Sequence, residues 1–386
     1  MRNISTGINL GSSTVRVVVG EFTKDEKEPK IIGVGEAPAA GMRRGYVVDE
    51  ELAVESVKRA VAQAEKTAEI KIRRAYLAVN NITSHGDIGL GSTIISKADS
   101  EVTMLDVRNA FEDAEDNLTL GNKKVLQMFP LTYKLDGKEV FGRPEGMHGN
   151  KLEVKALFVT TITQHFDNLL AVVAKAGVET IGVMPSIIAG SHLTLSKKQK
   201  MAGCLLVDIG AETVSMAVFE NENLIYLHTL PIGSDDITND IALGLKITLE
   251  EAESVKLGNL TDKFSKKKVD EIIEARLSDI FELIENHLKK IKRNELLPAG
   301  IIFIGAGSNI AMLTESAKNF LKLPTKVGTV EIFGNTKTKL RDPAWYSTLG
   351  LLNKNKGDYS LASNSLEGAW QHLKNLIKTN IKQLMP

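Results

Sequence analysis

The sequence lacks the residues that would mark a secreted, membrane-spanning or nucleic-acid-binding protein. Its 386 residues contain one cysteine, so no disulfide can form within the chain, which is typical of a reducing compartment. No apolar run approaches the roughly 20 residues that cross a bilayer, and the first residues show no signal-peptide pattern. Lysine and arginine total 48, as do aspartate and glutamate, so no basic excess is available for nucleic acid. We therefore expect a cytoplasmic protein that binds no nucleic acid and contacts a membrane only peripherally.

A pattern of apolar strand, glycine turn and apolar strand occurs in both halves of the chain. Residues 205–219 carry it with Asp208 before the glycine, and residues 5–20 carry it with Asn9 in that place. A third glycine turn follows the apolar run 301–304. Glycine has no Cβ, so a backbone amide can approach an anion closely. One such turn alone is more simply an ordinary hairpin, but the set predicts a duplicated domain that closes over one phosphate-bearing ligand.

Further motifs resemble the FtsA family of bacterial division actins, within the actin/Hsp70/sugar-kinase superfamily. They follow in order along nearly the whole chain: Gly45–Asp49, Pro144–Val154, Leu230–Gly233, Ile237–Leu245 and Ala252–Lys256. The resemblance implies an α/β, actin-like (ribonuclease-H-like) fold with two lobes, duplicated domains, a nucleotide cleft between the lobes and a small inserted α+β subdomain. It also implies a cell-division protein that binds nucleotide, self-assembles into filaments and tethers the FtsZ ring to the cytoplasmic face of the membrane.

Apolar spacing, turn residues and the resemblance together predict the division of the chain. The first lobe (subdomain 1A) comprises 1–80 and 156–201, and the inserted subdomain 1C at 81–155 interrupts it. The second lobe (subdomain 2A) comprises 202–230 and 299–352, and subdomain 2B at 231–298 interrupts it. A flexible linker at 353–368 precedes an amphipathic helix at 369–386. The alternative for 81–155 is a continuation of the first lobe.

Local patterns predict individual elements within these segments. In the insertion we expect one helix at 105–117, capped by Thr103 or Asp106, among short strands at 82–85, 92–95, 125–129 and 131–135. Further along, Thr248 and Glu251 have the spacing of a capping box and predict the start of a helix.

By resemblance, the three glycine turns form the nucleotide site. The residues expected to bind ATP or ADP are Asn9, Gly11, Ser12, Ser13, Arg16, Asp208, Gly210, Ala211, Thr213, Glu253, Lys256, Gly305, Gly307 and Ser308. Asn9 and Asp208 are expected to hold Mg²⁺ through water, and Asp208 is the candidate catalytic residue. Glu253 and Lys256 lie three apart on one helix face, where the resemblance implies contact with ribose and adenine and the alternative is a surface ion pair.

Several substitutions in these turns predict weak metal and phosphate chemistry. Asn9 brings no charge to a divalent ion. Ala211 puts a Cβ where the family pattern has glycine, and Ser215 replaces an acid. Glu212 would repel a phosphate at about 4 Å by about 4 kcal/mol at an intermediate effective dielectric, so we expect its side chain to turn toward solvent. The site is thus predicted to bind ATP or ADP, with a weakened Mg²⁺ site and weak or no ATPase activity.

The predicted partners are a membrane, FtsZ and further copies of the chain. In 369–386 the residues expected to face an anionic membrane surface are Trp370, Leu373, Lys374, Leu376, Ile377, Lys378, Ile381, Lys382 and Leu384. The alternative is a helix that docks on the core. By resemblance, Arg276 lies near the docking site for the C-terminal peptide of FtsZ, and a solvated arginine is the alternative.

Two other functions are compatible with a superfamily fold. PilM, an actin homologue of pilus assembly, is the alternative because its second turn also tends to read Asp-x-Gly-Ala. The inserted segment with Pro144–Gly149 and the amphipathic end favour the FtsA family. A sugar or acetate kinase ranks last, since no second substrate motif is visible and the metal-binding acid of the first turn is missing.

Overall fold

Two sheets with the same strand arrangement form the two lobes. The computed structural model describes residues 3–23, 28–259, 264–330 and 338–352. In the first lobe the strands are, in sheet order, β11 (Glu179–Pro185), β6 (Arg74–Val79), β1 (Asn3–Leu10), β2 (Thr14–Phe22) and β3 (Lys30–Pro38). In the second lobe they are β16 (Thr325–Val327), β15 (Ile301–Ile304), β12 (Cys204–Ile209), β13 (Val214–Glu220) and β14 (Asn223–Leu230).

Strand directions confirm the predicted duplication. In the first lobe β1, β2 and β3 form an antiparallel meander, and β1 also lies parallel to β6, which lies parallel to β11. In the second lobe β12, β13 and β14 form the same meander, and β12 lies parallel to β15, which lies parallel to β16. The first two strands of each meander are the hairpins that the repeated pattern predicts.

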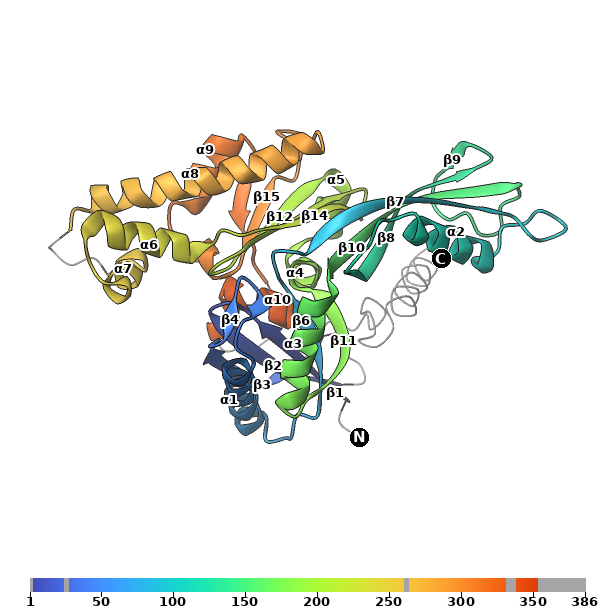
Figure 1. Ribbon diagram of the computed structural model, residues 1–386. Helices are drawn as coiled ribbons and strands as arrows, with labels where there is room; N and C mark the ends of the chain where they lie inside the picture. Colours follow the sequence, from blue (N-terminus) through green and yellow to red (C-terminus); the bar gives the residue numbers. More distant parts are fainter. Residues whose placement is uncertain (1–2, 24–27, 260–263, 331–337, 353–386) are drawn as a thin grey trace.

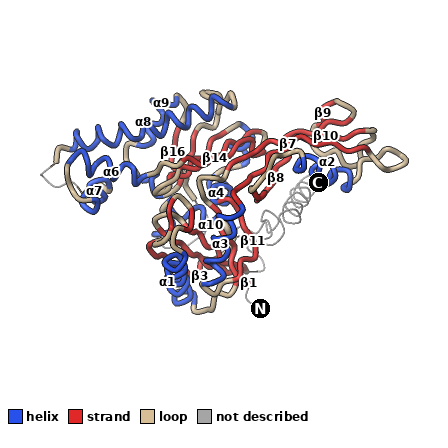
Figure 2. The backbone as a smooth tube through the Cα atoms, viewed as in Figure 1, coloured by secondary structure: helices blue, strands red, loops and turns tan. Residues whose placement is uncertain are grey.

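Helices fill the space between the sheets and cover their outer faces (Figures 1 and 2). α4 (Ser186–Thr194) and α10 (Tyr346–Gly350) belong to a central core that includes residues of both sheets. α4 carries no acidic residue, lysine or arginine, and its Ser191 and Thr194 hydroxyls donate to backbone carbonyls of the same helix, so it can be buried between the lobes. The outer face of the first sheet is covered by α1 (Glu50–Ala68) and α3 (Thr163–Lys175). That of the second sheet is covered by α6 (Ser234–Leu245), α7 (Leu249–Lys256), α8 (Lys266–Lys290) and α9 (Leu313–Leu321).

An inserted subdomain projects from the two lobes (Figure 1). It contains α2 (Met104–Asp116) and the strands β7 (His85–Ile94), β10 (Lys151–Ile162), β8 (Lys123–Leu135) and β9 (Lys138–Val140). These strands continue the sheet of the second lobe into one nine-stranded sheet, and the link is the pairing of His85 in β7 with His228 in β14. Of the two predicted caps, Thr103 is the N-cap of α2, and Asp106 completes a capping box with it. The remaining short elements are β4 (Met42–Arg43), β5 (Tyr46–Val47), α5 (Lys197–Ala202), η1 (Ala306–Asn309), η2 (Thr338–Arg341) and η3 (Pro343–Trp345).

Two strand predictions in the insertion are wrong. The segment 82–85 contains a turn, because the side chain of Asn81 accepts hydrogen bonds from Thr83 and Ser84, and β7 begins only at His85. The two strands expected at 125–129 and 131–135 are one strand, β8, whose register against β10 shifts near Pro130. Proline is tolerated there because a bulge needs no ladder hydrogen bond.

Candidate functional site

The two hairpins close with the same hydrogen bond. The amide of Gly11 donates to the Thr14 carbonyl at 3.1 Å, and the amide of Gly210 donates to the Thr213 carbonyl at 2.9 Å. Equivalent strand positions then carry different groups: in the first hairpin Asn9 is opposite Arg16, and in the second Asp208 is opposite Ser215. The backbone of the turn is therefore repeated, whereas its side-chain chemistry is not.

Asp208 lies where the two hairpins approach each other. Its side chain is buried, and its Oδ2 accepts a hydrogen bond of 2.9 Å from the Ser347 hydroxyl of α10. Burial raises the pKa of this carboxyl, while the Ser347 hydrogen bond and the charge of Arg16 act in the opposite direction. One segment of the chain contacts both hairpins, because the Arg16 guanidinium lies 5.6 Å from the Trp345 ring centroid and Ser347 binds Asp208.

The third glycine loop packs directly on the second hairpin. Gly305 has a φ of 86°, and a Cβ at this position would lie 2.3 Å from Asp208 Oδ1. A Cβ at Gly307 would lie 2.3 Å from Cγ2 of Ile209. Ser308 closes the loop by donating its hydroxyl to the Gly305 carbonyl at 2.7 Å. The loop thus has no room for side chains at its two glycines, and its backbone lies against the acid of the site.

The remaining groups of the first hairpin are one amide oxygen and one cation. Asn9 Oδ1 is buried and has no hydrogen-bond partner among the described residues. Arg16 pairs with Glu36 at 3.1 Å, and its guanidinium lies 5.6 Å from the Trp345 ring centroid. A carboxylate and an amide oxygen are the kind of ligands that Mg²⁺ accepts when phosphates and water complete its octahedron. The residues present therefore fit a magnesium ion held together with a phosphate.

Glu212 does not turn to solvent, which corrects our expectation. Its Oε2 accepts a hydrogen bond of 2.5 Å from the Arg44 amide, in the turn between β4 and β5 of the first lobe. The next amide, of Gly45, donates to the Ser12 hydroxyl at 3.0 Å. Neither contact was anticipated, because each joins residues far apart in the chain. Gly45, the first residue of the motif Gly45–Asp49, was the sequence signal that a tight turn lies here.

Glu253 and Lys256 form an ion pair in which the lysine is buried and the glutamate is half-exposed. Lys256 Nζ lies 2.6 Å from Glu253 Oε2, and the lysine side chain is only 7% exposed. The same ammonium donates to the Thr238 hydroxyl at 2.7 Å and to the Ser234 carbonyl at 3.2 Å. Three acceptors compensate the buried charge, so the lysine is held near the N-terminal end of α6.

The capping box of Thr248 with Glu251, at the start of α7, is as predicted.

Sequence comparisons assign this arrangement to a family. The family model described as "Cell division protein FtsA" matches residues 205–350, and the model described as "SHS2 domain inserted in FTSA" matches residues 79–160. The cell division protein FtsA of Bacillus subtilis (strain 168) is 29% identical over 367 residues, which is 89% of this chain and 82% of that protein. The chain belongs to the FtsA family.

Solved structures agree with the fold of this FtsA family member. The PilM-PilN type IV pilus biogenesis complex matches with a TM-score of 0.66 at 17% identity, over 95% of this chain and 98% of that one. MreB5 of Spiroplasma citri bound to ADP matches with a TM-score of 0.50 at 13% identity, over 98% of each. At these identities the likeness shows the two-lobed actin-like fold alone. Since the relatives in sequence are cell division proteins, the role is that of an actin-like cell-division protein, and the pilus-assembly alternative has no comparable support.

Arg276 of this FtsA family member lies on α8, away from the glycine loops. Its Nε and a terminal nitrogen donate to both carboxylate oxygens of Asp240 at 2.6 and 3.0 Å. A second terminal nitrogen lies 3.3 Å from Asp279. The alternative of a solvated arginine is therefore wrong: the guanidinium is already paired with two acids, and any peptide carboxylate would share or replace one of them.

The predicted linker and membrane-facing helix of this FtsA family member are not part of the described structure. The linker and the membrane-facing residues of 369–386 lie outside the described residues. None of the described helices combines the length and apolar composition of a bilayer-spanning segment. Within the same residues, no three His, Cys, Asp or Glu side chains cluster as a metal site.

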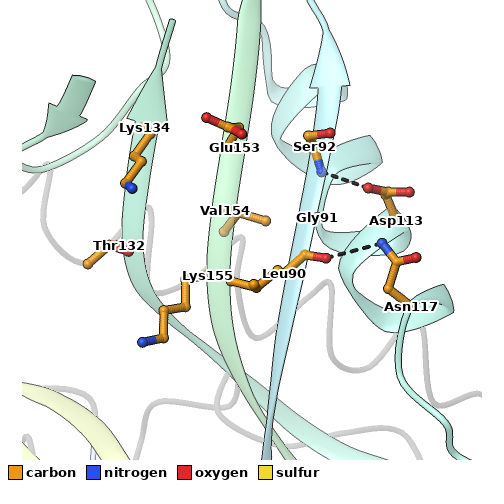
Figure 3. A pocket seen from close by; sticks show the side chains of 10 residues that line it. All are labelled: Leu90, Gly91, Ser92, Asp113, Asn117, Thr132, Lys134, Glu153, Val154 and Lys155. Atoms are coloured by element: carbon orange, nitrogen blue, oxygen red, sulfur yellow. Dashed lines mark hydrogen bonds between the residues drawn. The ribbon is translucent and has the colours of Figure 1, made fainter. Parts of the chain in front are cut away.

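The insertion contains a cavity that is separate from the site. Its volume is ≈ 330 Å³, and it is lined by residues of β7, β8, β10 and α2. Figure 3 shows Asp113 and Asn117 of α2 reaching the edge of β7, where they bind the Ser92 amide and the Leu90 carbonyl. These contacts occupy strand-edge groups that would otherwise be free to pair. The cavity therefore belongs to the packing of α2 on the sheet and not to the hairpin site.

Proposed function

We propose that this chain binds a nucleotide between its lobes and tethers the FtsZ ring to the inner face of the cell membrane. The observation that carries the nucleotide proposal is that the Gly305 loop packs on Asp208 of the second hairpin, while the adjoining residues Trp345 and Ser347 contact Arg16 of the first hairpin and Asp208. Amides of glycine turns and one cation can bind polyphosphate. MreB5 of Spiroplasma citri, which shares the fold, is bound to ADP in its crystal structure, and this agrees with the proposal.

The site is suited to binding rather than to fast hydrolysis. Asn9 and Asp208 would hold the waters of Mg²⁺, whose charge would offset that of the phosphates. Asn9 supplies an oxygen but no charge, so the metal is held by fewer negative ligands than a pair of carboxylates would provide. Asp208 accepts from Ser347 through Oδ2, so Oδ1, which borders the Gly305 loop, is the oxygen that would hold a metal-bound water. We therefore expect ADP or ATP binding with slow or undetectable turnover.

Calorimetric titration with ADP and ATP in the presence of Mg²⁺, followed by a phosphate-release assay, tests this proposal. Arg16→Gln should weaken nucleotide binding at least tenfold because it removes the cation of the first hairpin. Arg59→Gln, on the exposed face of α1, is the matched control and should bind normally. Phosphate release at about 1–100 per second, as in kinases, would contradict the proposal, as would the absence of any binding.

The tether is proposed to be the segment 369–386. Full-length chain should pellet with vesicles that contain anionic lipid, and a chain ending at Ser363 should remain in the supernatant. Replacing Lys374, Lys378 and Lys382 together by Gln should leave weak binding that depends little on salt, because the apolar half-face remains and the charge attraction is lost. Equal pelleting of the full and truncated chains would instead favour docking of the helix on the core.

The FtsZ contact is proposed to involve Arg276. Arg276→Glu should abolish binding of the acidic C-terminal peptide of FtsZ. Asp240→Asn is the matched control, since it weakens the same internal ion pair but leaves the arginine available, so it should bind the peptide at least as well as the native chain. Loss of binding in both variants would attribute the effect to a disturbed α6–α8 contact.

Self-assembly is proposed to involve the inserted subdomain. Removal of residues 81–155 should therefore abolish filaments on lipid monolayers.

A further inference from the structure

Glu212 connects the two lobes at the site proposed for the nucleotide. Its carboxylate, in the turn of the second hairpin, accepts the hydrogen bond of the Arg44 amide from the first lobe at 2.5 Å. The Thr213 hydroxyl in the same turn lies 3.4 Å from Asn80 Nδ2, and Ser215 donates to Asn80 Oδ1 at 2.9 Å. Glu212, Thr213 and Ser215 of the second hairpin thus all contact the first lobe. Of these three residues, only Glu212 is charged.

The Arg44 amide lies in a hairpin turn and takes no part in the strand pairing. Arg44 and Gly45 have φ values of 48° and 77°, the pattern of a type I′ turn between β4 and β5, so both amides are available to other groups. One of these amides donates to Glu212 of the second hairpin, and the other donates to Ser12 of the first. This turn therefore lies between the two phosphate-binding loops, and a carboxylate of the chain already occupies one of its amides.

Glu212 also lies near Asp235, at the start of α6. Burial raises the pKa of Asp235, Lys256 lowers it, and Glu212 raises it further. Lys256 and Glu253 are the residues expected to contact the nucleoside. The Asp235 amide donates to the Ala211 carbonyl at 2.8 Å, so the turn that carries Glu212 packs on the start of α6, which also holds Lys256. A phosphate placed between the hairpins would be repelled by the Glu212 carboxylate.

We propose that Glu212 is an anion of the chain itself that joins the lobes and makes the site select nucleoside diphosphates over triphosphates. A triphosphate brings one more charged group, which must either displace the carboxylate from the Arg44 amide or lie beside it. A diphosphate can bind with the contact intact. This inference rests on the proposed nucleotide site and adds the residue that determines its specificity.

Calorimetric titration of the full chain with ADP and ATP, both with Mg²⁺, tests the selectivity. Native protein should bind ADP more tightly than ATP. Glu212→Gln keeps an acceptor for the Arg44 amide but removes the charge, so ATP affinity should rise at least tenfold while ADP affinity changes less than threefold. Glu222→Gln removes the same charge from the exposed β13–β14 turn and should change neither. Equal shifts for ADP and ATP, or no shift, would overturn the proposal.

A second measurement separates the contact from the nucleotide site. Amide hydrogen exchange without nucleotide should be faster in a peptide covering 39–48 for Glu212→Ala than for the native chain, with Glu222→Ala unchanged. Unchanged exchange in Glu212→Ala would overturn the lobe-joining contact even where nucleotides bind. Failure of every variant to bind nucleotide would overturn the selectivity together with the proposed site, while faster exchange would still support the contact.

Discussion

The two hairpins of the site have the same backbone and opposite charge. Each turn closes through a glycine amide that donates to the carbonyl three residues later, at Gly11 and at Gly210. The first hairpin carries Arg16 and a neutral Asn9, whereas the second carries Asp208 and Glu212. Duplication has therefore kept the geometry that presents amides and has separated the charges, so that positive charge comes from one lobe and negative charge from the other.

The hairpins also differ in how tightly they are enclosed. The second lies under the Gly305 loop and under Ser347 of α10, which contact Asp208 directly. Around the first, Arg16 pairs with Glu36 and lies over the Trp345 ring. We conclude that changes at the enclosed residues Asp208 and Gly305 should act first on packing and stability. Changes at the charged residues Arg16 and Glu212 should act first on ligand binding.

The largest expected effect is steric and concerns the enclosed hairpin. Gly305→Ala should lower the free energy of unfolding by about 2–4 kcal/mol, because its Cβ would lie 2.3 Å from Asp208 Oδ1 at a positive φ. Gly142→Ala is the control: Gly142 has a φ of 91° with no atom within 4 Å of the added Cβ, so only about 1–2 kcal/mol of backbone strain is expected. Urea unfolding measures both, and equal losses would show that the loop can move aside.

The buried acid should give the next effect, and it should depend on pH. The folded-state pKa of Asp208 is raised, so its contribution to stability is fully present below the unfolded pKa and is lost as pH rises through the folded pKa. Asp208→Asn, measured without Mg²⁺, should thus be more stable than the native chain at pH 7, by about 1.4 kcal/mol for each unit of elevation. The difference should shrink as pH falls. A less stable Asp208→Asn at pH 7 contradicts this expectation.

A third variant makes the two hairpins alike. Asn9→Asp would place a second carboxylate at the position equivalent to Asp208, and with Mg²⁺ we expect nucleotide affinity to rise about tenfold, or about 1.4 kcal/mol. In EDTA the added charge has no metal to neutralise it, so affinity should fall below that of the native chain. Calorimetry under the two conditions is the measurement. The same change in affinity with and without metal would argue against a magnesium site here.

The smallest effect is expected from the residue opposite Asp208. Ser215 is buried, donates to Asn80 Oδ1 at 2.9 Å and lies 3.1 Å from the Thr229 hydroxyl. Ser215→Ala should lower the free energy of unfolding by about 1 kcal/mol, since one buried hydrogen bond is lost. Nucleotide affinity should stay within twofold of the native value, unlike that of Arg16→Gln at the equivalent strand position. A larger loss of affinity would assign Ser215 to the binding site.

Features with local causes were predictable from the sequence. The duplicated hairpins depend on apolar strands around a glycine turn, and the capping boxes of Thr103 with Asp106 and of Thr248 with Glu251 depend on residues three apart. The inserted segment was recognised from motifs within it. In each case the deciding contacts lie within one turn or one hairpin, so the order of residues along the chain contains the information.

The remaining features depend on contacts between distant segments, and only the tertiary structure decided them. The Glu212 carboxylate meets an amide 168 residues away, and Asp208 meets a hydroxyl of α10 139 residues away. Lys256 is buried because the N-terminal end of α6 supplies a carbonyl acceptor. No local pattern encodes which distant group will satisfy a side chain, because burial and pairing are set when the lobes pack together. Residue types thus predict where the proposed site lies, and packing determined what its charges contact.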